Sequence, residues 1–318
     1  MLTALVQLRL CRWRIPDDTG LQEGGGEGGY HVRCLRSLFN SAAAPAIDLE
    51  TSRLHTAALA MVGHTSLSGV QKKIAVSLSA DRATLQVAAT GGRYVLKPQT
   101  GVYPCLPENE HLTTLLAGLV DIPVAASGLI QLKDASPAFI SRRFDRLADG
   151  RKVHQEDFCQ LAGLPARSKY DASAETCVKI VRRYVSEPSV ELLRLYTLLL
   201  FVWWSGNGDM HLKNFSLLTD ANRFTRLTPA YDLVCTRLLI PDDPLALPLL
   251  GRHQHLRRGH WLQFAEYCGI PEKAARRVLD RQCSALSGSI ELIHRSFLPP
   301  EQQQEYAAII AANTAAIQ

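Results

Sequence analysis

The amino-acid sequence predicts an α+β fold with two lobes, a small antiparallel β-rich N-terminal lobe and a mostly helical C-terminal lobe. Three short segments with strand-like apolar patterns lie between residues 74 and 97, and a helical pattern follows them. From residue 157 onward the patterns are mainly helical. We therefore expect an N-terminal extension over residues 1–62, an N-lobe over 63–143 and a C-lobe over 144–318.

Composition limits the classes of protein that this chain of 318 residues can belong to. Apolar residues make up 47% and charged residues 20%, which permits an ordinary buried core. The formal charge of +5 is compatible with nucleotide or anionic partners but is not a nucleic-acid signature. The eight cysteines are scattered, which is typical of reduced thiols. The start of the chain has no clean signal peptide, and the most apolar run, Leu192–Trp204, is too short for a bilayer. We expect a soluble, cytoplasmic protein.

The first 62 residues carry the weakest signals. Leu2–Leu10 is compatible with a short strand. The run Gly24–Gly29 superficially resembles a phosphate loop, but no apolar strand precedes it and no Lys-Ser/Thr follows. A flexible linker is the better interpretation.

The predicted N-lobe begins with three strands. Ile74, Val76 and Leu78 alternate with more polar residues, Thr84–Ala88 suggests a second strand, and Arg93–Lys97 ends a third strand on a lysine. Lys97 is either a solvated strand end or the lysine that grips nucleotide phosphates, as in the Val-Ala-Ile-Lys strand of kinases. Its position ahead of a candidate catalytic loop favours the second interpretation.

A helix is expected from Pro107 to Leu119, with acidic residues in its first turn. We expect Glu110 to pair with Lys97, and Glu108 to cap the helix. Strands are expected at Gly128–Leu132 and Ala138–Arg146, the second of which would form the hinge beside adenine.

The C-lobe is predicted to open with helical segments at Asp157–Ala162 and Ser173–Val185, followed by a long helix with Ser189 as its N-cap. The aromatic residues near the end of that long helix are better explained as core packing than as base-stacking surfaces. They are Phe201, Trp203 and Trp204.

The long helix leads into the loop that defines the candidate site. Asp209 and Asn214 have the Asp-x-x-x-x-Asn spacing of a kinase catalytic loop, and Asp232 stands where the metal-binding Asp-Phe-Gly would come. In phosphoryl transfer one carboxylate takes the acceptor proton, while an amide oxygen and a second carboxylate hold Mg²⁺. A polar turn that only satisfies backbone groups would also contain Gly, Asp and Asn. The second aspartate favours the catalytic interpretation.

Other residues have alternative interpretations. His211 would orient the loop or contact a phosphate, and Lys213 would stabilise the migrating phosphoryl group. The histidines at 253, 255 and 260 suggest a polar loop more than a metal site, because no acidic or cysteine ligand lies at suitable spacing. The neighbouring arginines 252, 257 and 258 form a small basic patch, either a solvated face or a docking surface.

Several motifs together resemble the HipA family of bacterial serine/threonine-kinase toxins over roughly residues 60 to 250. They are Ser66-Leu67-Ser68-Gly69-Val70-Gln71-Lys72-Lys73, Tyr94-Val95-Leu96-Lys97, Glu108-Asn109-Glu110-His111, Arg142-Arg143-Phe144-Asp145-Arg146, His154-Gln155-Glu156, Gly206-Asn207-Gly208-Asp209-Met210-His211-Leu212-Lys213-Asn214-Phe215 and Pro229-Ala230-Tyr231-Asp232-Leu233.

This resemblance implies a two-lobed protein-kinase-like (HipA-like) fold, ATP with Mg²⁺, and an aminoacyl-tRNA synthetase as the phosphorylated target. It implies that Asp209 is the base, that Asn214 and Asp232 hold the metal, and that Lys97 grips the phosphates. The nucleotide-binding set that it implies is Ser68, Gly69, Val70, Gln71, Lys72, Lys73, Arg142, Arg143, Phe144, His211 and Tyr231. A loop serine is autophosphorylated in the family and switches the kinase off, which corresponds to Ser66, with Ser68 as a second candidate.

The chain also departs from long members of the family. Its nucleotide loop has one glycine, and its hinge has Arg142 where an acid is common. About 65 residues precede the loop, which resembles the short HipT form, with a separate small HipS-like antitoxin and a DNA-binding HipB-like partner. Two other functions fit the same loop: a small-molecule phosphotransferase, and a non-catalytic binding module.

Overall fold

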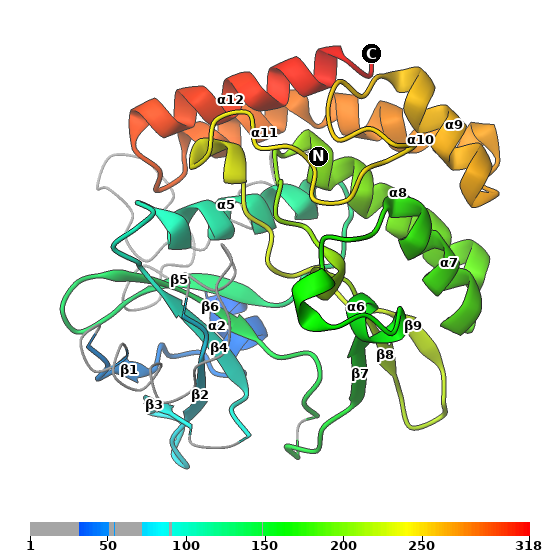
Figure 1. Cartoon of the computed structure of the whole chain (residues 1–318). Coiled ribbons are helices and arrows are strands. Elements are labelled where there is room, and N and C mark those ends of the chain that lie inside the picture. Colours follow the sequence, from blue (N-terminus) through cyan, green and yellow to red (C-terminus); the bar gives the residue numbers. More distant parts are fainter. Residues whose placement is uncertain (1–31, 51–53, 55–71, 89–90, 148) are drawn as a thin grey trace. The chain divides into compact units, whose positions relative to one another are not determined.

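The computed structural model describes residues 32–50, 54, 72–88, 91–147 and 149–318 (Figure 1). The chain divides into two compact units. The first contains Met1–His111 and Ala125–Gly150, and the second contains Leu112–Val124 and Arg151–Gln318. The predicted strand Leu2–Leu10, the run Gly24–Gly29 and the loop residues Ser66–Gln71 lie outside the described residues.

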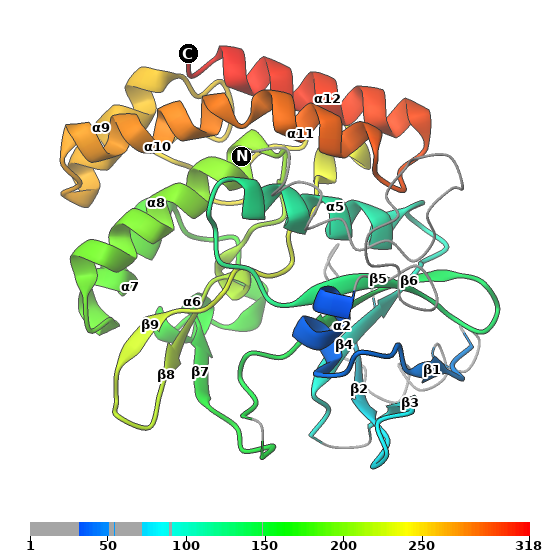
Figure 2. The ribbon, with the colours of Figure 1, turned by 180° about the vertical axis from the view of Figure 1, so that it is seen from behind.

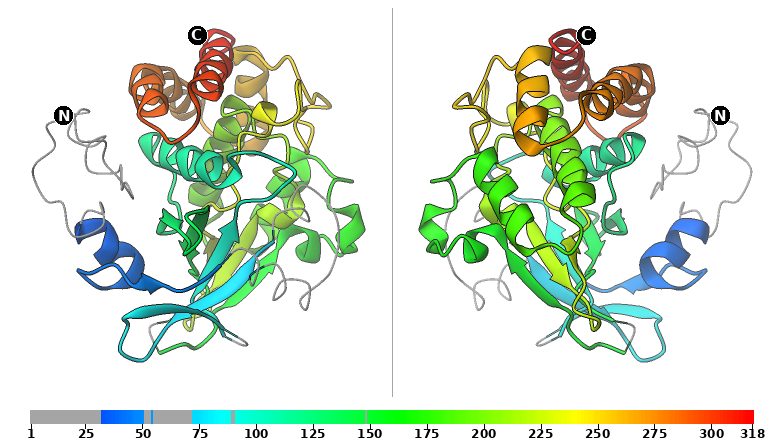
Figure 3. Two further views of the ribbon diagram at one scale, coloured as in Figure 1. Left: turned by 90° about the vertical axis from the view of Figure 1, so that its left-hand side faces the viewer. Right: turned by 90° about the vertical axis from the view of Figure 1, so that its right-hand side faces the viewer.

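The first unit is built on a six-stranded sheet with the order β1-β3-β2-β4-β6-β5. All neighbouring strands are antiparallel except β1 and β3, which are parallel. The strands are β1 (Ala46–Ile47), β2 (Ile74–Leu78), β3 (Thr84–Val87), β4 (Tyr94–Pro98), β5 (Ser127–Gln131) and β6 (Pro137–Arg142). Helix α2 (Val32–Phe39) packs against this sheet (Figure 3).

The alternation that predicted the first strand is present in the sheet. Ile74 and Val76 are fully buried in the same core as Tyr94 and Leu96 of β4. Since side chains alternate between the two faces of a strand, Lys97 is directed away from that core. It stands opposite Phe139 of β6 in the ladder.

Helix α5 (Leu106–Leu119) begins in the first unit and ends in the second. The second unit is otherwise mainly helical. Its helices of four or more residues are α6 (Phe158–Leu161), α7 (Ala174–Tyr184), α8 (Pro188–Trp204), α9 (Arg258–Cys268), α10 (Glu272–Ser284), α11 (Leu286–His294) and α12 (Pro300–Ala315). Figure 2 shows α7 and α8 lying side by side.

The helix starts follow local capping chemistry with one correction. Asp157 caps α6 by accepting the backbone N–H of Gln160 at 2.8 Å, and Ser173 is the N-cap of α7. The prediction of Ser189 as the N-cap of α8 is wrong, because the helix already begins at Pro188 with Glu187 as N-cap. Proline is well suited to the first helical position, where its missing N–H would have no helical partner.

The end of α8 is held by α12. The side-chain amide of Asn313 donates to the carbonyl oxygens of Trp203 and Trp204 at 3.1 and 3.0 Å. The indole N–H of Trp204 donates to the hydroxyl of Thr314 at 2.8 Å. These bonds satisfy carbonyls that a helix end leaves without partners, and they fix the point where the polar loop begins. Phe201 and Trp204 are fully buried, as expected for core residues.

A three-stranded antiparallel sheet in the second unit was not predicted. Its order is β7-β8-β9, with β7 at His154–Asp157, β8 at Ser216–Thr219 and β9 at Thr225–Leu227. These strands are short, and β7 consists entirely of polar residues, so that its sequence lacks the apolar alternation on which strand prediction depends. Among the described residues, no helix is long and apolar enough to cross a membrane.

Candidate active site

The polar loop after α8 is shaped by tight backbone bonds. The N–H groups of Ser205 and Asn207 donate back to the carbonyls of Phe201 and Val202 at 2.8 and 3.0 Å. Gly206 adopts a φ of 71°, in the left-handed region that favours glycine. The chain therefore leaves the helix by a sharp turn that brings Asp209 close behind the helix end.

Asp209 and Asn214 are linked directly. The side-chain amide of Asn214 donates to the backbone carbonyl of Asp209 at 3.0 Å. The backbone N–H of Asp209 donates to the side-chain oxygen of Asn207 at 3.1 Å. Because the nitrogen of the Asn214 amide is engaged in the first bond, its oxygen is the atom suited to a cation. The five-residue spacing thus allows the side chain of Asn214 to bond the backbone of Asp209, which fixes the two residues relative to each other.

The carboxylate of Asp209 lies in an unusual electrostatic environment. Burial raises its pKa above the ordinary value, a hydrogen bond from Tyr170 and the charge of Lys169 lower it, and the charges of Asp232 and Asp243 raise it. The net effect is a raised pKa, which makes this carboxylate a better proton acceptor than an ordinary exposed aspartate. The contribution from Asp232 also places the two aspartates within electrostatic range of each other.

Asp232 is anchored through the residue before it. The hydroxyl of Tyr231 lies 2.6 Å from the hydroxyl of Ser216 and donates to the carbonyl of Lys213 at 3.1 Å. Asp232 itself has a φ of 55°, which is uncommon for a residue with a side chain. The half-buried tyrosine therefore ties the 231–233 segment to the loop that carries Asp209 and Asn214.

Two further loop residues have defined neighbours. Lys213 forms an ion pair with Asp157, with 2.7 Å between Nζ and Oδ2. The ammonium is therefore directed at a carboxylate of this chain, and its action on a phosphoryl group stays a prediction. His211 is buried and meets the ring of Tyr170 edge to face, with 5.1 Å between ring centroids.

Sequence reasoning missed a polar network on the other side of the loop. The N–H of Gly208 donates to the hydroxyl of Thr236 at 2.7 Å, and that hydroxyl donates to the carboxylate of Asp243. Asp243 approaches Gly208 so closely that a Cβ there would overlap it. Residues 241–244 are rich in proline and aspartate, but that composition does not indicate that Asp243 has Thr236 as its partner.

The first unit contains the predicted lysine and glutamate in contact. Nζ of Lys97 lies 2.5 Å from Oε1 of Glu110, and both side chains are almost fully buried. The ammonium also lies 5.7 Å from the centroid of the Phe139 ring. The strand and the helix therefore position one charged pair, as expected for a lysine that is to be held in one orientation.

The predicted hinge residues have mixed surroundings. Arg142 is exposed at the end of β6, whereas Arg143 donates two bonds to Asp145 at 2.9 and 2.8 Å. Arg146 also pairs with Asp145. Burial acts to raise the pKa of Asp145, but the two guanidinium groups outweigh it and lower the pKa. Asp145 thus organises the segment that contains Phe144, a role that sequence reasoning did not assign. Lys72 and Lys73 directly precede β2, and their contact with a nucleotide stays a prediction.

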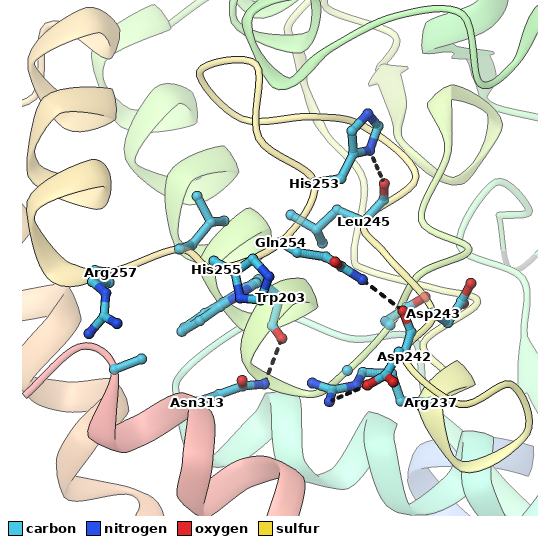
Figure 4. Close-up of a pocket in the computed structure, with 14 residues that line it drawn as sticks. Trp203, Arg237, Asp242, Asp243, Leu245, His253, Gln254, His255, Arg257 and Asn313 are labelled. Atoms are coloured by element: carbon cyan, nitrogen blue, oxygen red, sulfur yellow. Dashed lines mark hydrogen bonds and ion pairs between the residues drawn. The ribbon is translucent and has the colours of Figure 1, made fainter.

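A cavity of about 540 Å³ lies within the second unit, beside the polar loop (Figure 4). Gly206 and Asn207 contribute to its wall, together with His253, His255 and Arg257 from the segment interpreted as a polar, basic loop. Across the described ranges, no group of three or more His, Cys, Asp and Glu residues could hold a metal. Mg²⁺ commonly uses only one or two protein carboxylates beside phosphates and water, so the oxygens of Asn214 and Asp232 fit it chemically.

The fold and this site define a mixed α+β protein with a kinase-type loop. Residues 65–290 match the model of the HipA-like C-terminal domain, and the chain belongs to that family. It is 31% identical over 226 residues to Y4mE of Sinorhizobium fredii, whose name describes it as a kinase, covering 67% of this chain and 53% of that protein. A kinase-named protein of Haemophilus influenzae is 30% identical over 224 residues, covering 64% of each chain.

Solved structures show the same fold. HipA of Shewanella oneidensis MR-1, solved with HipB and operator DNA, matches with a TM-score of 0.68 and 18% identity, covering 98% of this chain and 85% of that one. The Helicobacter pylori proinflammatory kinase CtkA matches with a TM-score of 0.51 and 15% identity, covering 70% and 87%. The α+β, HipA-like fold class is therefore confirmed. The chain spans about half to two thirds of the length of the curated relatives it matches.

Proposed function

We propose that this protein is an ATP- and Mg²⁺-dependent serine/threonine-protein kinase and the toxin of a bacterial toxin–antitoxin system. The observation that carries the proposal is the arrangement within the second unit. Asp209 has a raised pKa, Asn214 is bonded to the backbone of the same aspartate at 3.0 Å, and Asp232 lies within electrostatic range. Phosphoryl transfer from a nucleotide requires these three oxygen-bearing groups together.

Each residue has a proposed role. Asp209 accepts the proton of the acceptor hydroxyl as that oxygen attacks the γ-phosphorus, and ADP leaves with the bridging oxygen. Asn214 and Asp232 would hold Mg²⁺, which supplies neutralising charge at the phosphates when bound. Glu110 holds Lys97 in a fixed orientation for contact with the nucleotide phosphates. Phe144 and the residues beside it would border adenine.

The substrate and partners that we propose follow from the family. The target is an aminoacyl-tRNA synthetase, whose phosphorylation would halt translation and arrest growth in the cytoplasm. The Shewanella structure contains HipA together with HipB and operator DNA, which supports a HipB-like antitoxin partner here, and we propose a small HipS-like antitoxin beside it. Ser66 or Ser68 is the proposed site of inactivating autophosphorylation.

A phosphoproteome recorded shortly after induction tests this function. Cells that express the wild-type chain should accumulate one strongly phosphorylated synthetase, and cells that express Asp209→Asn should not. Label that appears on small metabolites and never on protein would instead support a small-molecule phosphotransferase. Growth arrest that persists with both Asp209→Asn and Asp232→Ala would support a non-catalytic module.

A further inference from the structure

Tyr170 lies at the candidate base although nothing in its sequence context marks it as functional. Its hydroxyl donates a hydrogen bond to Oδ1 of Asp209 over 2.5 Å. The residue stands 39 positions before the aspartate and follows a short 3₁₀ turn at Ala166–Ser168. The side chain is 39% exposed, so the contact occurs at the surface of the unit rather than in its core.

The position of this hydroxyl has a direct chemical meaning. A general base must lie within about 2.6–3.2 Å of the hydroxyl from which it takes a proton. With 2.5 Å between the two oxygens, the Tyr170 hydroxyl lies slightly closer to Asp209 than this range. It therefore stands where a serine or threonine hydroxyl of a substrate would have to stand if it used the same oxygen. The two hydroxyl groups cannot occupy that place together.

The backbone around Tyr170 is tied to the polar loop while its ring is partly exposed. The N–H of Leu212 donates to the carbonyl of Lys169 at 3.1 Å. The ring rests edge-on against His211, and Nζ of Lys169 lies 5.0 Å from the ring centroid. A rotation of the side chain would therefore uncover Asp209 without displacing the segment, because the backbone bond does not depend on the ring.

We propose that Tyr170 is a gate that occupies the acceptor position beside Asp209 and must turn away before an acceptor hydroxyl can reach this carboxylate. This inference rests on the proposed phosphotransferase function and adds a self-blocking contact to the same site. The tyrosine acts as a competing hydroxyl, so its removal increases access to the base. A tyrosine that stayed in place during the reaction and oriented the carboxylate would have the opposite effect.

Hydrolysis of ATP in the absence of a protein acceptor tests the gate, because water is then the acceptor that competes with the Tyr170 hydroxyl for the place beside Asp209. Water attacks the γ-phosphorus, the bond to the bridging oxygen breaks, ADP leaves, and Asp209 takes the proton. Tyr170→Phe should raise the hydrolysis rate about tenfold, the factor expected for loss of one hydrogen bond to a carboxylate. Tyr170→Ala should raise it at least as much. Tyr184→Phe is the matched control, since the Tyr184 hydroxyl donates to the carbonyl of Leu161 at 3.5 Å and not to a residue of the polar loop. This change should leave the rate unchanged.

A rate of ATP hydrolysis that falls or stays constant in both Tyr170 variants would overturn the gate. A fall would indicate that Tyr170 orients the Asp209 carboxylate during the reaction, and a constant rate would indicate that Tyr170 has no role in it. A measurement that needs no catalysis separates this failure from failure of the proposed function. With 3-fluorotyrosine at position 170, the ¹⁹F resonance should move when Asp209 is changed to Asn, and a label at position 184 should not. An unmoved resonance at 170 would overturn the inference. If the resonance moves but neither wild type nor any variant hydrolyses ATP, the contact stands and the kinase proposal fails.

Discussion

The buried pair of Lys97 and Glu110 allows a quantitative prediction. Their charged atoms are 2.5 Å apart and their side chains are only 4% and 1% exposed, so neither charge has water to replace a lost partner. Removing one member of such a pair leaves an uncompensated buried charge and costs about 3–5 kcal/mol. Glu110→Gln should therefore lower the free energy of unfolding by that amount, although the amide nearly preserves the shape of the side chain.

Urea unfolding followed by circular dichroism would measure this loss, and amide hydrogen exchange in β4 and α5 would locate it. Lys97→Met combined with Glu110→Leu should cost clearly less than the sum of the two single changes, because no charge remains buried alone. The i,i+4 pair of Arg276 and Glu272 is a matched control. It has the same 2.5 Å separation but side chains that are 49% and 66% exposed, so Glu272→Gln should cost less than about 1 kcal/mol. Equal losses for Glu110→Gln and Glu272→Gln would refute the reasoning from burial.

Three further predictions concern other parts of the molecule. Gly208→Ala would place a Cβ against the carboxylate of Asp243 and 2.6 Å from the carbonyl of Pro244, and should lower the melting temperature and destabilise the protein by about 1–3 kcal/mol through overpacking. Burial lowers the pKa of His111 to about 4 from 6.5, so the unfolded chain takes up the proton first. Stability should consequently fall between about pH 6.5 and pH 4 by up to about 3 kcal/mol, and a His111→Gln variant measured by urea unfolding should lose much of this slope. Intact-mass measurement after incubation with ATP should show added phosphate that disappears when Ser66 and Ser68 are both alanine, and label that persists would move the modified site elsewhere.

Local patterns were sufficient to predict much of the fold. The alternation at Ile74, Val76 and Leu78 predicted β2, and the acidic first turn after Pro107 predicted α5. Strand β7 escaped because its residues are all polar, and it is held by pairing with β8 about 60 residues later in the chain. Sequence periodicity contains no information about that distant partner.

The candidate site likewise combines contacts within one loop, which the sequence predicts, with contacts between distant segments, which it does not. The spacing of Asp209 and Asn214 is visible in the sequence because both residues belong to one loop. The contacts of Tyr170 with Asp209 and of Lys213 with Asp157 join residues 39 and 56 positions apart. Such pairs are created only by the tertiary fold, since either residue alone is an ordinary polar side chain. Sequence reasoning therefore named the candidate base but not the groups that surround it.

Transfer of ³²P from γ-labelled ATP by the purified protein is the most direct test of the central claim. With Mg²⁺ present, the wild-type chain should label protein, either itself or an added synthetase, and Asp209→Asn should abolish the labelling while its urea-unfolding midpoint stays close to that of the wild type. Labelling by Asp209→Asn at the wild-type rate would show that this aspartate is not the base and would contradict the account.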